Sequence, residues 1–571
     1  MYQLKKKSPE TANMDWLDEP IQTHENNLTH QQLTDDDWIP QEQQSSKQVK
    51  RIVTVKNGEL DKIVDLCELE LTDTGEYFHS SGQIVRVAFD PFLCEKFITP
   101  VTRAAITRSL DRRISWRRKN KNSDGPVQEV VIDPPTKYIA LLHETETYPH
   151  LPHLIGIARQ PFFRADKTLM NTTGYDAQTG YFGSFTESEF SIPENPTRQD
   201  AIAALNILSD LLEEFAFAAP CDKNAAIAAI LTAATRISIS TAPMFHVSAH
   251  QIATGKSYLT SIFSSFASST SPSPLAFPTS EEECQKTLIA ALMRSPPTIV
   301  FDNLTNDILA FKSLCSATTE ESLTGRILGA SKVASVSTKT LLLSSGNNVG
   351  PIKDMSRRCL TIKLDPKVEI PTTRNFAKDP LELIRRNRAY YVSLALMIVR
   401  AWFVNDCPIT KCKPLNSYGE WTKYVRQPLM WLGLSDPAER IFTQLTEDPD
   451  REQLGQLLLA WRGVFMDSYT SIREVVEKSG TIALGADELR EVIGDLALER
   501  GEINRKRLGR WIARHQGQIV DGLRFVRGPS ASGVERWRVM SVTMVSGVLG
   551  VTNFSEITDL SAKEEDGGVP F

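Results

Sequence analysis

The stretch that most constrains the fold is residues 245–259, FHVSAHQIATGKSYL. An apolar run, MFHVSA, precedes the triplet Gly255-Lys256-Ser257, and an amphipathic segment, GKSYLTSIFSSFA, contains and extends it. This order predicts a strand, a tight loop and a helix, an arrangement that surrounds nucleotide phosphates with backbone N–H groups. The lysine would neutralise β/γ-phosphate oxygens, and the serine hydroxyl would reach a magnesium ion. We therefore expect ATP and Mg²⁺ as cofactors, with ATP bound by Ala253, Thr254, Gly255, Lys256, Ser257 and Tyr258.

One residue departs from the usual loop pattern. His250 stands five residues before Gly255, where such loops normally have a glycine. A histidine there would cost about 1 kcal/mol if its φ had to be positive. The substitution removes none of the groups that face phosphate, so we expect the loop to bind nucleotide.

Polar residues follow three later apolar runs. Asp302 ends SPPTIVFDNL and is expected to hold the magnesium shell opposite Ser257, the alternative being the acidic end of a core strand. Asn347 (or Asn348) ends TLLLSSGNN and could orient the attacking water. Arg357 and Arg358, in DMSRRCL, could reach the nucleotide of a neighbouring subunit and stabilise transition-state charge.

The series ATGKS, VFDN, TGRILGASKVASVSTKTLLLSSGNN and DMSRRCL resembles AAA+ ATPases of the superfamily III helicase type. More narrowly, it resembles the helicase-like replication proteins of phages, plasmids and integrated mobile elements, over about residues 130–540. The resemblance implies ATP-driven translocation on DNA by a ring, usually a homo-hexamer. It also implies a DNA-gripping hairpin at 325–340, with Lys332 near its tip; a purely structural hairpin is the alternative.

The general base of hydrolysis has no obvious candidate beside Asp302. Asn303 stands where many such ATPases have a glutamate. Glu283, in EEECQK, is a candidate base, although an acid that caps a helix N-terminus is the more frequent role. Arg326 is a further candidate for a contact with a neighbouring subunit, or for an ion pair at the base of the hairpin.

Residues 467–540 predict a winged helix, that is, three helices followed by two strands. The third helix, NRKRLGRWIARHQ, would place against DNA the residues Arg505, Lys506, Arg507, Arg510 and Arg514. The wing would add Arg524, Arg527, Arg536 and Arg538. A winged helix can also dock proteins, and that alternative stays open.

Charge distribution supports a nucleic-acid partner. The net charge is −6, yet residues 101–121 hold eight basic residues and one acidic residue, and residues 500–540 hold ten and three. Each segment also has aromatic side chains, Trp116 in the first and Trp511, Phe525 and Trp537 in the second, that could stack or pack near a nucleic-acid backbone. The alternative is two solvated basic faces.

The chain is expected to be multidomain, with mixed α/β and α+β units. The predicted divisions are a disordered acidic tail (1–50), an α+β domain (51–190), an AAA+ ATPase with a parallel sheet (191–370), a helical region (371–466), the winged helix (467–540) and a flexible acidic tail (541–571). Scattered cysteines and a start without a signal peptide favour the cytoplasm. The longest apolar run, 390–404, is too short to span a bilayer and predicts a buried helix.

The chain ends in acids followed by Val569, Pro570 and Phe571. This ending is similar to the acidic tail of bacterial single-stranded-DNA-binding proteins, which implies host or element replication proteins that recognise such tails as partners. An uninvolved end is the alternative.

The leading hypothesis is therefore an ATP-dependent, ring-forming DNA helicase or translocase for replication of a mobile genetic element. An origin-binding or helicase-loading ATPase that uses ATP as a switch is the second. A nucleotide-binding scaffold without turnover is the third, and His250 and Asn303 keep the last two open.

Overall fold

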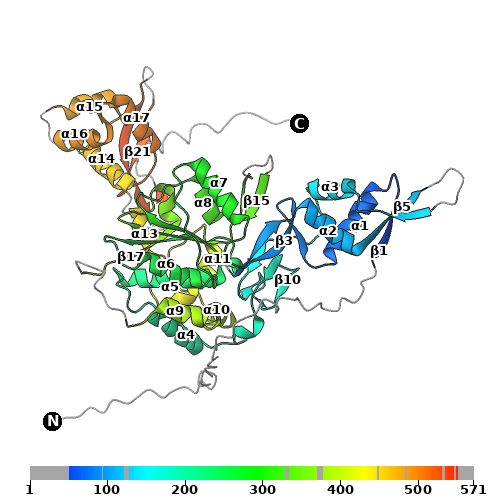
Figure 1. The fold of residues 1–571 in the computed structure, drawn as a ribbon. Coiled ribbons are helices and arrows are strands. Elements are labelled where there is room, and N and C mark those ends of the chain that lie inside the picture. Colours follow the sequence, from blue (N-terminus) through cyan, green and yellow to red (C-terminus); the bar gives the residue numbers. More distant parts are fainter. Residues whose placement is uncertain are drawn as a thin grey trace, which may run out of the picture.

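The computed structural model describes residues 50–545 and 548–550, apart from 93, 121–127, 328–332, 369–376, 447–448, 482–484 and 530–533. Most of the two predicted tails, including Val569, Pro570 and Phe571, and the predicted hairpin-tip residue Lys332 lie outside the described residues. Within them the fold is mixed α/β (Figure 1).

A four-stranded parallel sheet forms the centre of the molecule. Its strands are β12 (Met244–Ala249), β13 (Thr298–Leu304), β16 (Leu341–Asn347) and β17 (Cys359–Leu364), in the spatial order β13-β16-β12-β17. Apart from a few polar positions these strands are buried aliphatic runs, as expected for a parallel sheet covered on both faces. All carboxyl ends of the strands therefore meet at one edge, called here the carboxyl edge, and the amino ends meet at the opposite, amino edge.

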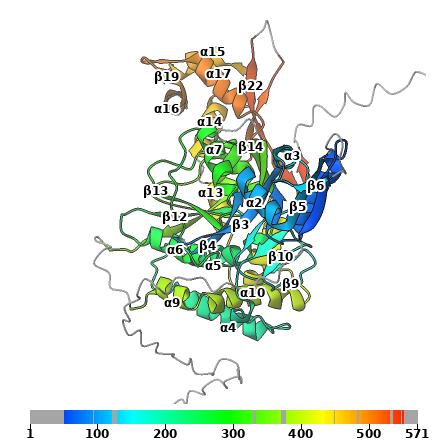
Figure 2. The same ribbon diagram turned by 45° about the vertical axis from the view of Figure 1, so that its right-hand side comes forward.

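Two hydrophobic cores cover the two faces of this sheet. One face packs against α4 (Arg198–Asp210), α5 (Pro220–Thr235), α6 (Lys256–Ser265), α9 (Pro380–Arg386) and α10 (Arg388–Val404). Figures 1 and 2 both show α4, α9 and α10 as an outer layer beyond α5 and α6. The other face packs against α7 (Glu281–Leu292), α8 (Lys312–Thr319) and the hairpin of β14 (Ser322–Arg326) and β15 (Val333–Ser337).

The predicted helical region 371–466 is not one unit, and this boundary needs correction. Helices α9, α10, α11 (Gly419–Trp421), η5 (Thr422–Arg426), α12 (Gln427–Trp431) and α13 (Glu439–Thr446) contribute to the same core as α5 and β12. Trp421 is fully buried there, and its Nε1 donates to Thr232 Oγ1 of α5 at 2.8 Å. Helix α14 (Pro449–Phe465) instead packs, through Leu454, Leu458 and Trp461, into the C-terminal core. The apolar faces, not the chain order, decide this division.

The N-terminal unit is α+β, as predicted. It has two three-stranded sheets: β1 (Arg51–Val55), β5 (Ile114–Asn120) and β6 (Gln128–Val131), and β2 (Tyr77–Ser80), β3 (Gln83–Asp90) and β4 (Glu95–Pro100). Helices α1 (Leu60–Thr72), α2 (Arg103–Arg113) and α3 (Thr136–Glu144) complete its core. Short strands follow, namely β7 (Gly156–Ala158), β8 (Phe162–Phe163), β9 (Leu169–Met170), β10 (Gly174–Asp176) and β11 (Tyr181–Gly183), and then η1 (Glu187–Glu189).

The C-terminal unit combines α14, α15 (Ile472–Ser479), α16 (Ala486–Ala497) and α17 (Arg505–Arg514) with a small antiparallel sheet. The sheet has the order β18 (Thr470–Ser471), β22 (Arg536–Ser541), β21 (Leu523–Arg527). The pairs β19 (Leu498–Glu499) with β20 (Glu502–Ile503), and β23 (Thr543–Val545) with β24 (Val548–Gly550), are short hairpins. In Figures 1 and 2 this unit projects from the sheet beyond α14.

The apolar run 390–404 lies in α10, most of whose side chains are buried against the shared core. Among the described residues, no helix combines the length and apolar character needed to cross a membrane.

Candidate functional site: a phosphate loop at the carboxyl edge

The structure has the strand, loop and helix that the sequence predicts around residue 255. Strand β12 ends at Ala249, and α6 begins at Lys256. Gly255 precedes the helix with φ 90°, and Ala253 has φ 58°. Both are in the left-handed region, which glycine enters without the steric cost that a Cβ brings. The tight turn therefore falls at 253–255, and the first backbone N–H groups of α6 face the loop.

His250 is not among the residues with positive φ, so the expected strain at this position is absent. Instead, its Nδ1 lies 2.9 Å from Asn348 Oδ1, and Asn348 Nδ2 donates to the His250 carbonyl at 3.3 Å. The Asn348 N–H donates to Ala249 O. The His250 side chain, which stands where such loops normally have a glycine, therefore holds the loop entry against the end of β16.

Lys256 and Ser257 lie at the start of α6, and each contacts groups of its own. The Lys256 ammonium donates to Gln251 O at 3.1 Å and to Thr254 Oγ1 at 3.2 Å. Burial lowers the pKa of Lys256, and the nearby Asp302 charge opposes that shift. The Ser257 hydroxyl donates to Asp302 Oδ1 at 2.9 Å, so the structure brings the two predicted magnesium residues together.

Asp302 is fixed by groups that the sequence analysis did not single out. Ser345, fully buried in β16, donates its hydroxyl to Asp302 Oδ1, and the Asn303 N–H donates to the same oxygen at 3.0 Å. The β13–β16 register shifts between Phe301 and Leu304, and Asn303 has φ 57°. Such a bulge re-aims the side chain beside it. Two serines inside an otherwise apolar strand, LLLSSGN, are the signal that could have identified Ser345.

The neighbouring serine has a different partner. Ser344 Oγ lies 2.9 Å from His246 Nδ1, and His246 Nε2 lies 2.9 Å from Val349 O. His246 is fully buried in β12, and desolvation lowers its pKa to about 4. A neutral imidazole therefore ties β12 to β16 just below the loop.

Asn347 and Asn348 differ in their hydrogen-bond partners. Asn348 is engaged with His250, as described above. The Asn347 Oδ1 atom is buried and has no hydrogen-bond partner among the described residues. Asn347 ends β16, which lies between the loop strand β12 and the Asp302 strand β13. Asn347 is thus the amide left available at the carboxyl edge.

Among the described residues, Glu283 makes no contact with Asp302. Its carboxylate accepts from Thr279 N at 2.8 Å and Thr279 Oγ1 at 2.9 Å, and these bonds lower its pKa. This is the capping role that the sequence analysis kept as the alternative. Asn303, the residue after Asp302, directs its amide to that aspartate instead of supplying a carboxylate.

Arg357 and Arg358 lie at the amino edge of the sheet, opposite the loop, because they end η3 (Lys353–Arg357) and precede β17. Both pair with Asp354, which has a lowered pKa as a result. Arg358 is mostly buried, with 12% side-chain exposure, and also donates to Thr319 Oγ1 at 2.6 Å. Arg357 is 46% exposed. Within one chain neither arginine is positioned to reach its own loop, and only Arg357 extends outward.

Tyr258 has a structural contact through its hydroxyl. That hydroxyl donates to Asp379 Oδ1 at 2.5 Å and accepts from Leu381 N at 3.0 Å. Burial, followed by the Asp379 contact, raises the pKa of Tyr258 to about 12. The hydroxyl therefore joins α6 to the start of α9, which leaves only the backbone and ring for a nucleotide.

The five basic residues predicted on the third C-terminal helix are all exposed on α17. Four of them lie on the face opposite the buried Leu508 and Ile512, namely Lys506, Arg507, Arg510 and Arg514, while Arg505 begins the helix on the other side. No ion pair of the described residues involves them. The arginines of the two strands differ, because Arg527 pairs with Glu535, and Arg536 pairs with Glu474 at 3.7 Å. Arg538 lies over the Tyr469 ring, and Arg524 is half-buried.

Three of the four aromatic side chains predicted to stack on bases belong to the cores, which corrects that expectation. Trp116 is 1% exposed and stacks on Tyr138, while Phe525 and Trp537 are fully buried in the C-terminal core. Only Trp511 is partly exposed, and it packs on His515. Alternation along a strand could have indicated this, because the arginines beside Phe525 and Trp537 occupy the outer face.

The residues present at the loop fit a magnesium ion. A hydroxyl and a carboxylate oxygen, from Ser257 and Asp302, lie together, and Mg²⁺ prefers a few oxygen ligands while it keeps several waters. No cluster of three or more His, Cys, Asp or Glu residues with metal-binding geometry occurs among the described residues.

No family model and no curated protein matches the sequence. Among solved structures, the apo A form of the NrS-1 C-terminal region is 11% identical, over 80% of this chain and 96% of that chain, with a TM-score of 0.33. JCV helicase, in a crystal structure with a bound N-phenylacetamide compound, is 13% identical, over 43% of this chain and 69% of that chain, with a TM-score of 0.19. Similarity at this level assigns no function to the chain.

Proposed function

We propose that this protein is an ATP-dependent, ring-forming DNA helicase or translocase that acts in replication of a mobile genetic element. The observation that carries the proposal is the contact between Ser257 Oγ and Asp302 Oδ1, 2.9 Å, beside Lys256 at the carboxyl edge of the parallel sheet. Ligands bind outside the carboxyl ends of such strands. The core is proposed to be an AAA+ ATPase of the superfamily III type.

Each residue has a defined part in this proposal. Backbone N–H groups of 253–257 surround the phosphates, and Lys256 neutralises their negative charge. Ser257 and Asp302 hold the magnesium ion, which supplies charge neutralisation on the β/γ oxygens when it is bound. Asn347, with its free Oδ1, orients water beside the γ-phosphate.

A ring explains the position of Arg357. The exposed part of its side chain lies at the edge of the sheet opposite the loop of the same chain, so a phosphate contact requires a second copy. We propose a homo-hexamer in which Arg357 of one copy stabilises transition-state charge at the next. Arg358, mostly buried, holds the segment in place.

DNA is proposed to contact α17 and the β14–β15 hairpin. The exposed basic face of α17 supports insertion of this helix against a groove and phosphates, as in a winged helix. The hairpin strands run 322–326 and 333–337, close to the predicted 325–340. Proteins that recognise the acidic Val569-Pro570-Phe571 ending are proposed as further partners.

An origin-binding or helicase-loading ATPase, with ATP as a switch, is the second candidate. It is favoured by one observation: Asn303 follows Asp302, and Glu283 is engaged by Thr279, so neither of these two candidate positions supplies a free carboxylate to act as base.

One experiment separates the two candidates. ATP hydrolysis by the full chain is measured with and without single-stranded DNA, and with Lys256→Ala. A helicase predicts turnover that DNA stimulates at least tenfold and that Lys256→Ala abolishes. Slow turnover that DNA does not change, with ATP binding retained, contradicts the helicase and supports the switch.

A further inference from the structure

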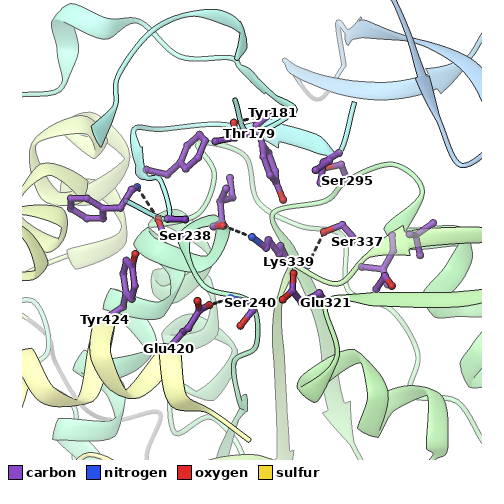
Figure 3. Close-up of a pocket in the computed structure, with 18 of the residues that line it drawn as sticks. Thr179, Tyr181, Ser238, Ser240, Ser295, Glu321, Ser337, Lys339, Glu420 and Tyr424 are labelled. Carbon is purple, nitrogen blue, oxygen red and sulfur yellow. Dashed lines mark hydrogen bonds between the residues drawn. The ribbon is translucent and has the colours of Figure 1, made fainter. Parts of the chain in front are cut away.

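A large cavity lies at the amino edge of the central sheet, on the side away from the phosphate loop. Its volume is about 1640 Å³. The N-terminal unit contributes His153 and Tyr181, the sheet edge contributes Ser295 and Lys339, and the helical segment contributes Tyr424. Figure 3 shows these parts of the chain converging on one space. Nothing in the proposed function uses this cavity.

The central sheet connects the cavity to the nucleotide site. Ser295 precedes β13, and Lys339 precedes β16, so both strands begin at the cavity wall. Near their other ends the same strands carry Asp302, two residues before the end of β13, and Asn347, the last residue of β16. The cavity and the phosphate loop are therefore separate sites at opposite ends of the same two strands.

The lining carries an excess of positive charge. Eight lysine and arginine side chains line the cavity, against two acids, Glu321 and Glu420. Arg164 and Arg426 pair with aspartates that are not part of the lining. Lys413 and Lys423 are exposed to the cavity and pair with no acid among the described residues. A field of this kind favours an anionic occupant.

Two buried polar groups in the lining have few partners. Tyr181 is 5% exposed, and among the described residues its hydroxyl makes no hydrogen bond of standard geometry, although the Ser337 side chain lies near it. A buried hydroxyl without a partner costs free energy, and a bound polar group would supply that partner. The Lys339 ammonium donates to Ile237 O at 3.1 Å, and burial lowers the pKa of Lys339. Figure 3 shows Tyr181 and Lys339 directed into the same part of the cavity.

Aromatic side chains occupy the opposite wall. Phe403 packs edge to face with Phe163 and with Tyr424, and Lys167 Nζ lies 5.3 Å from the centre of the Phe403 ring. Phe163 and Tyr424 are buried in the shared core, whereas Phe403 is partly exposed. A groove that combines basic residues with an accessible aromatic ring is the usual composition of a site for unpaired nucleotides, since every base has a face that can stack.

We propose that this cavity binds a short segment of single-stranded nucleic acid, with its phosphates toward Lys413 and Lys423 and a base near Phe403. The inference rests on the proposed function in one respect: the bound segment is part of the strand that the proposed helicase translocates. A volume above the roughly 300–1,000 Å³ of small-molecule sites suits a polymer segment. Paired bases are already stacked and offer no free face, which disfavours a duplex.

Binding of a fluorescent oligothymidylate to the full chain, without ATP, tests the inference. The background carries Arg507→Ala and Arg510→Ala, so that α17 does not mask the cavity. Lys413→Glu with Lys423→Glu should weaken binding at least tenfold and reduce the salt slope by about 1.4, because each lost single-strand phosphate contact removes about 0.7. The matched control is Lys411→Glu with Lys312→Glu, two exposed lysines outside the lining, which should change affinity less than threefold.

The Tyr181→Phe variant tests whether weaker oligonucleotide binding in the lysine variants results from misfolding. Because it removes a hydroxyl that makes no hydrogen bond of standard geometry among the described residues, the melting temperature should change little, while oligonucleotide affinity should fall about fivefold. An oligonucleotide carrying 5-iodouracil should cross-link within 402–427 or 162–181. Unchanged affinity in both cavity variants, or cross-links confined to other segments, would overturn the inference.

Competitors identify the chemistry of the occupant. Oligothymidylate and oligouridylate distinguish DNA from RNA as the source of the strand. A duplex, or a peptide with the acidic sequence KEEDGGVPF, should compete at least tenfold less well, and equal competition by either would contradict a single-strand site. The proposed function and this inference can fail separately. If the full chain does not hydrolyse ATP, but the cavity variants still bind the oligonucleotide more weakly than the parent does, the proposed function is wrong and this inference is supported.

Discussion

At the scale of single residues, Ser345 provides the sharpest test of the magnesium site. Its hydroxyl donates to Asp302, while the equally buried Ser344 contacts His246. A hydrogen bond to a charged group contributes about 1.5–3 kcal/mol. Ser345→Ala should therefore raise the Mg²⁺ concentration needed for half-maximal ATP hydrolysis about tenfold or more. Ser344→Ala, the neighbouring control, should lower thermal stability and leave the Mg²⁺ requirement unchanged; the reverse pattern would exclude this role for Ser345.

The two neighbouring arginines should behave differently from each other. Arg357→Ala should lower ATP hydrolysis by about 10³-fold or more, as arginines supplied in trans do, without a change in ATP affinity or melting temperature. Arg358→Ala should lower the melting temperature, because it removes contacts to Asp354 and Thr319. Mixing Arg357→Ala with Lys256→Ala subunits should restore part of the activity, since some interfaces then combine intact partners. No recovery in the mixture would argue against the trans position.

The residue types and spacing of the loop were predictable, but the geometry around it was not. Gly255, Lys256, Ser257 and Asp302 are recognisable in the sequence because phosphate binding requires those groups in that order. The sequence does not show that His250 contacts Asn348, or that Thr279 engages Glu283, since each contact depends on the side chain's direction in the folded chain.

At the scale of elements, α17 should dominate DNA binding by the C-terminal unit. Arg507→Ala with Arg510→Ala should weaken duplex binding and reduce the salt slope by about 1.8, at about 0.9 for each lost phosphate contact. Arg536→Ala should have a smaller effect, because this arginine already pairs with Glu474. Arg490→Ala on the adjacent α16 is the matched control for an exposed arginine. An unchanged slope in the α17 variant would remove the helix from the interface.

Local signals predicted the elements better than their grouping. Thr197 is the N-cap of α4 and forms a capping box with Asp200, which is a local sequence signal of a helix start. The 174–182 segment is a hairpin of β10 and β11. The assignment of α14 to the C-terminal core depended on Leu454 and Trp461 finding distant partners, which local periodicity does not record.

At the scale of the whole molecule, burial of His246 in the central sheet makes the free energy of unfolding depend on pH in the acidic range. Its pKa is lowered from 6.5 to about 4 in the folded chain by burial. Between these values the unfolded chain binds a proton that the folded chain does not, so stability falls as pH drops from about 6.5 toward 4. The loss is about 3 kcal/mol at most. Thermal unfolding from pH 7.5 to 5 should show a shallower pH dependence in His246→Asn than in the parent. The exposed His250→Gln is the control, and an equal slope in all three proteins would contradict this linkage.

The shared core described above has a consequence for how such genes recombine. Helices α9 to α13 complete the interior of the central sheet, whereas α14 begins a separate interior. A crossover that joined foreign sequence between β17 and α10 would divide one interior between two ancestries and leave apolar surface uncovered. A crossover between α13 and α14 would exchange the C-terminal unit intact. Recombinant relatives of this chain are therefore expected to carry their junctions at that second position, where inheritance of one half does not constrain the other.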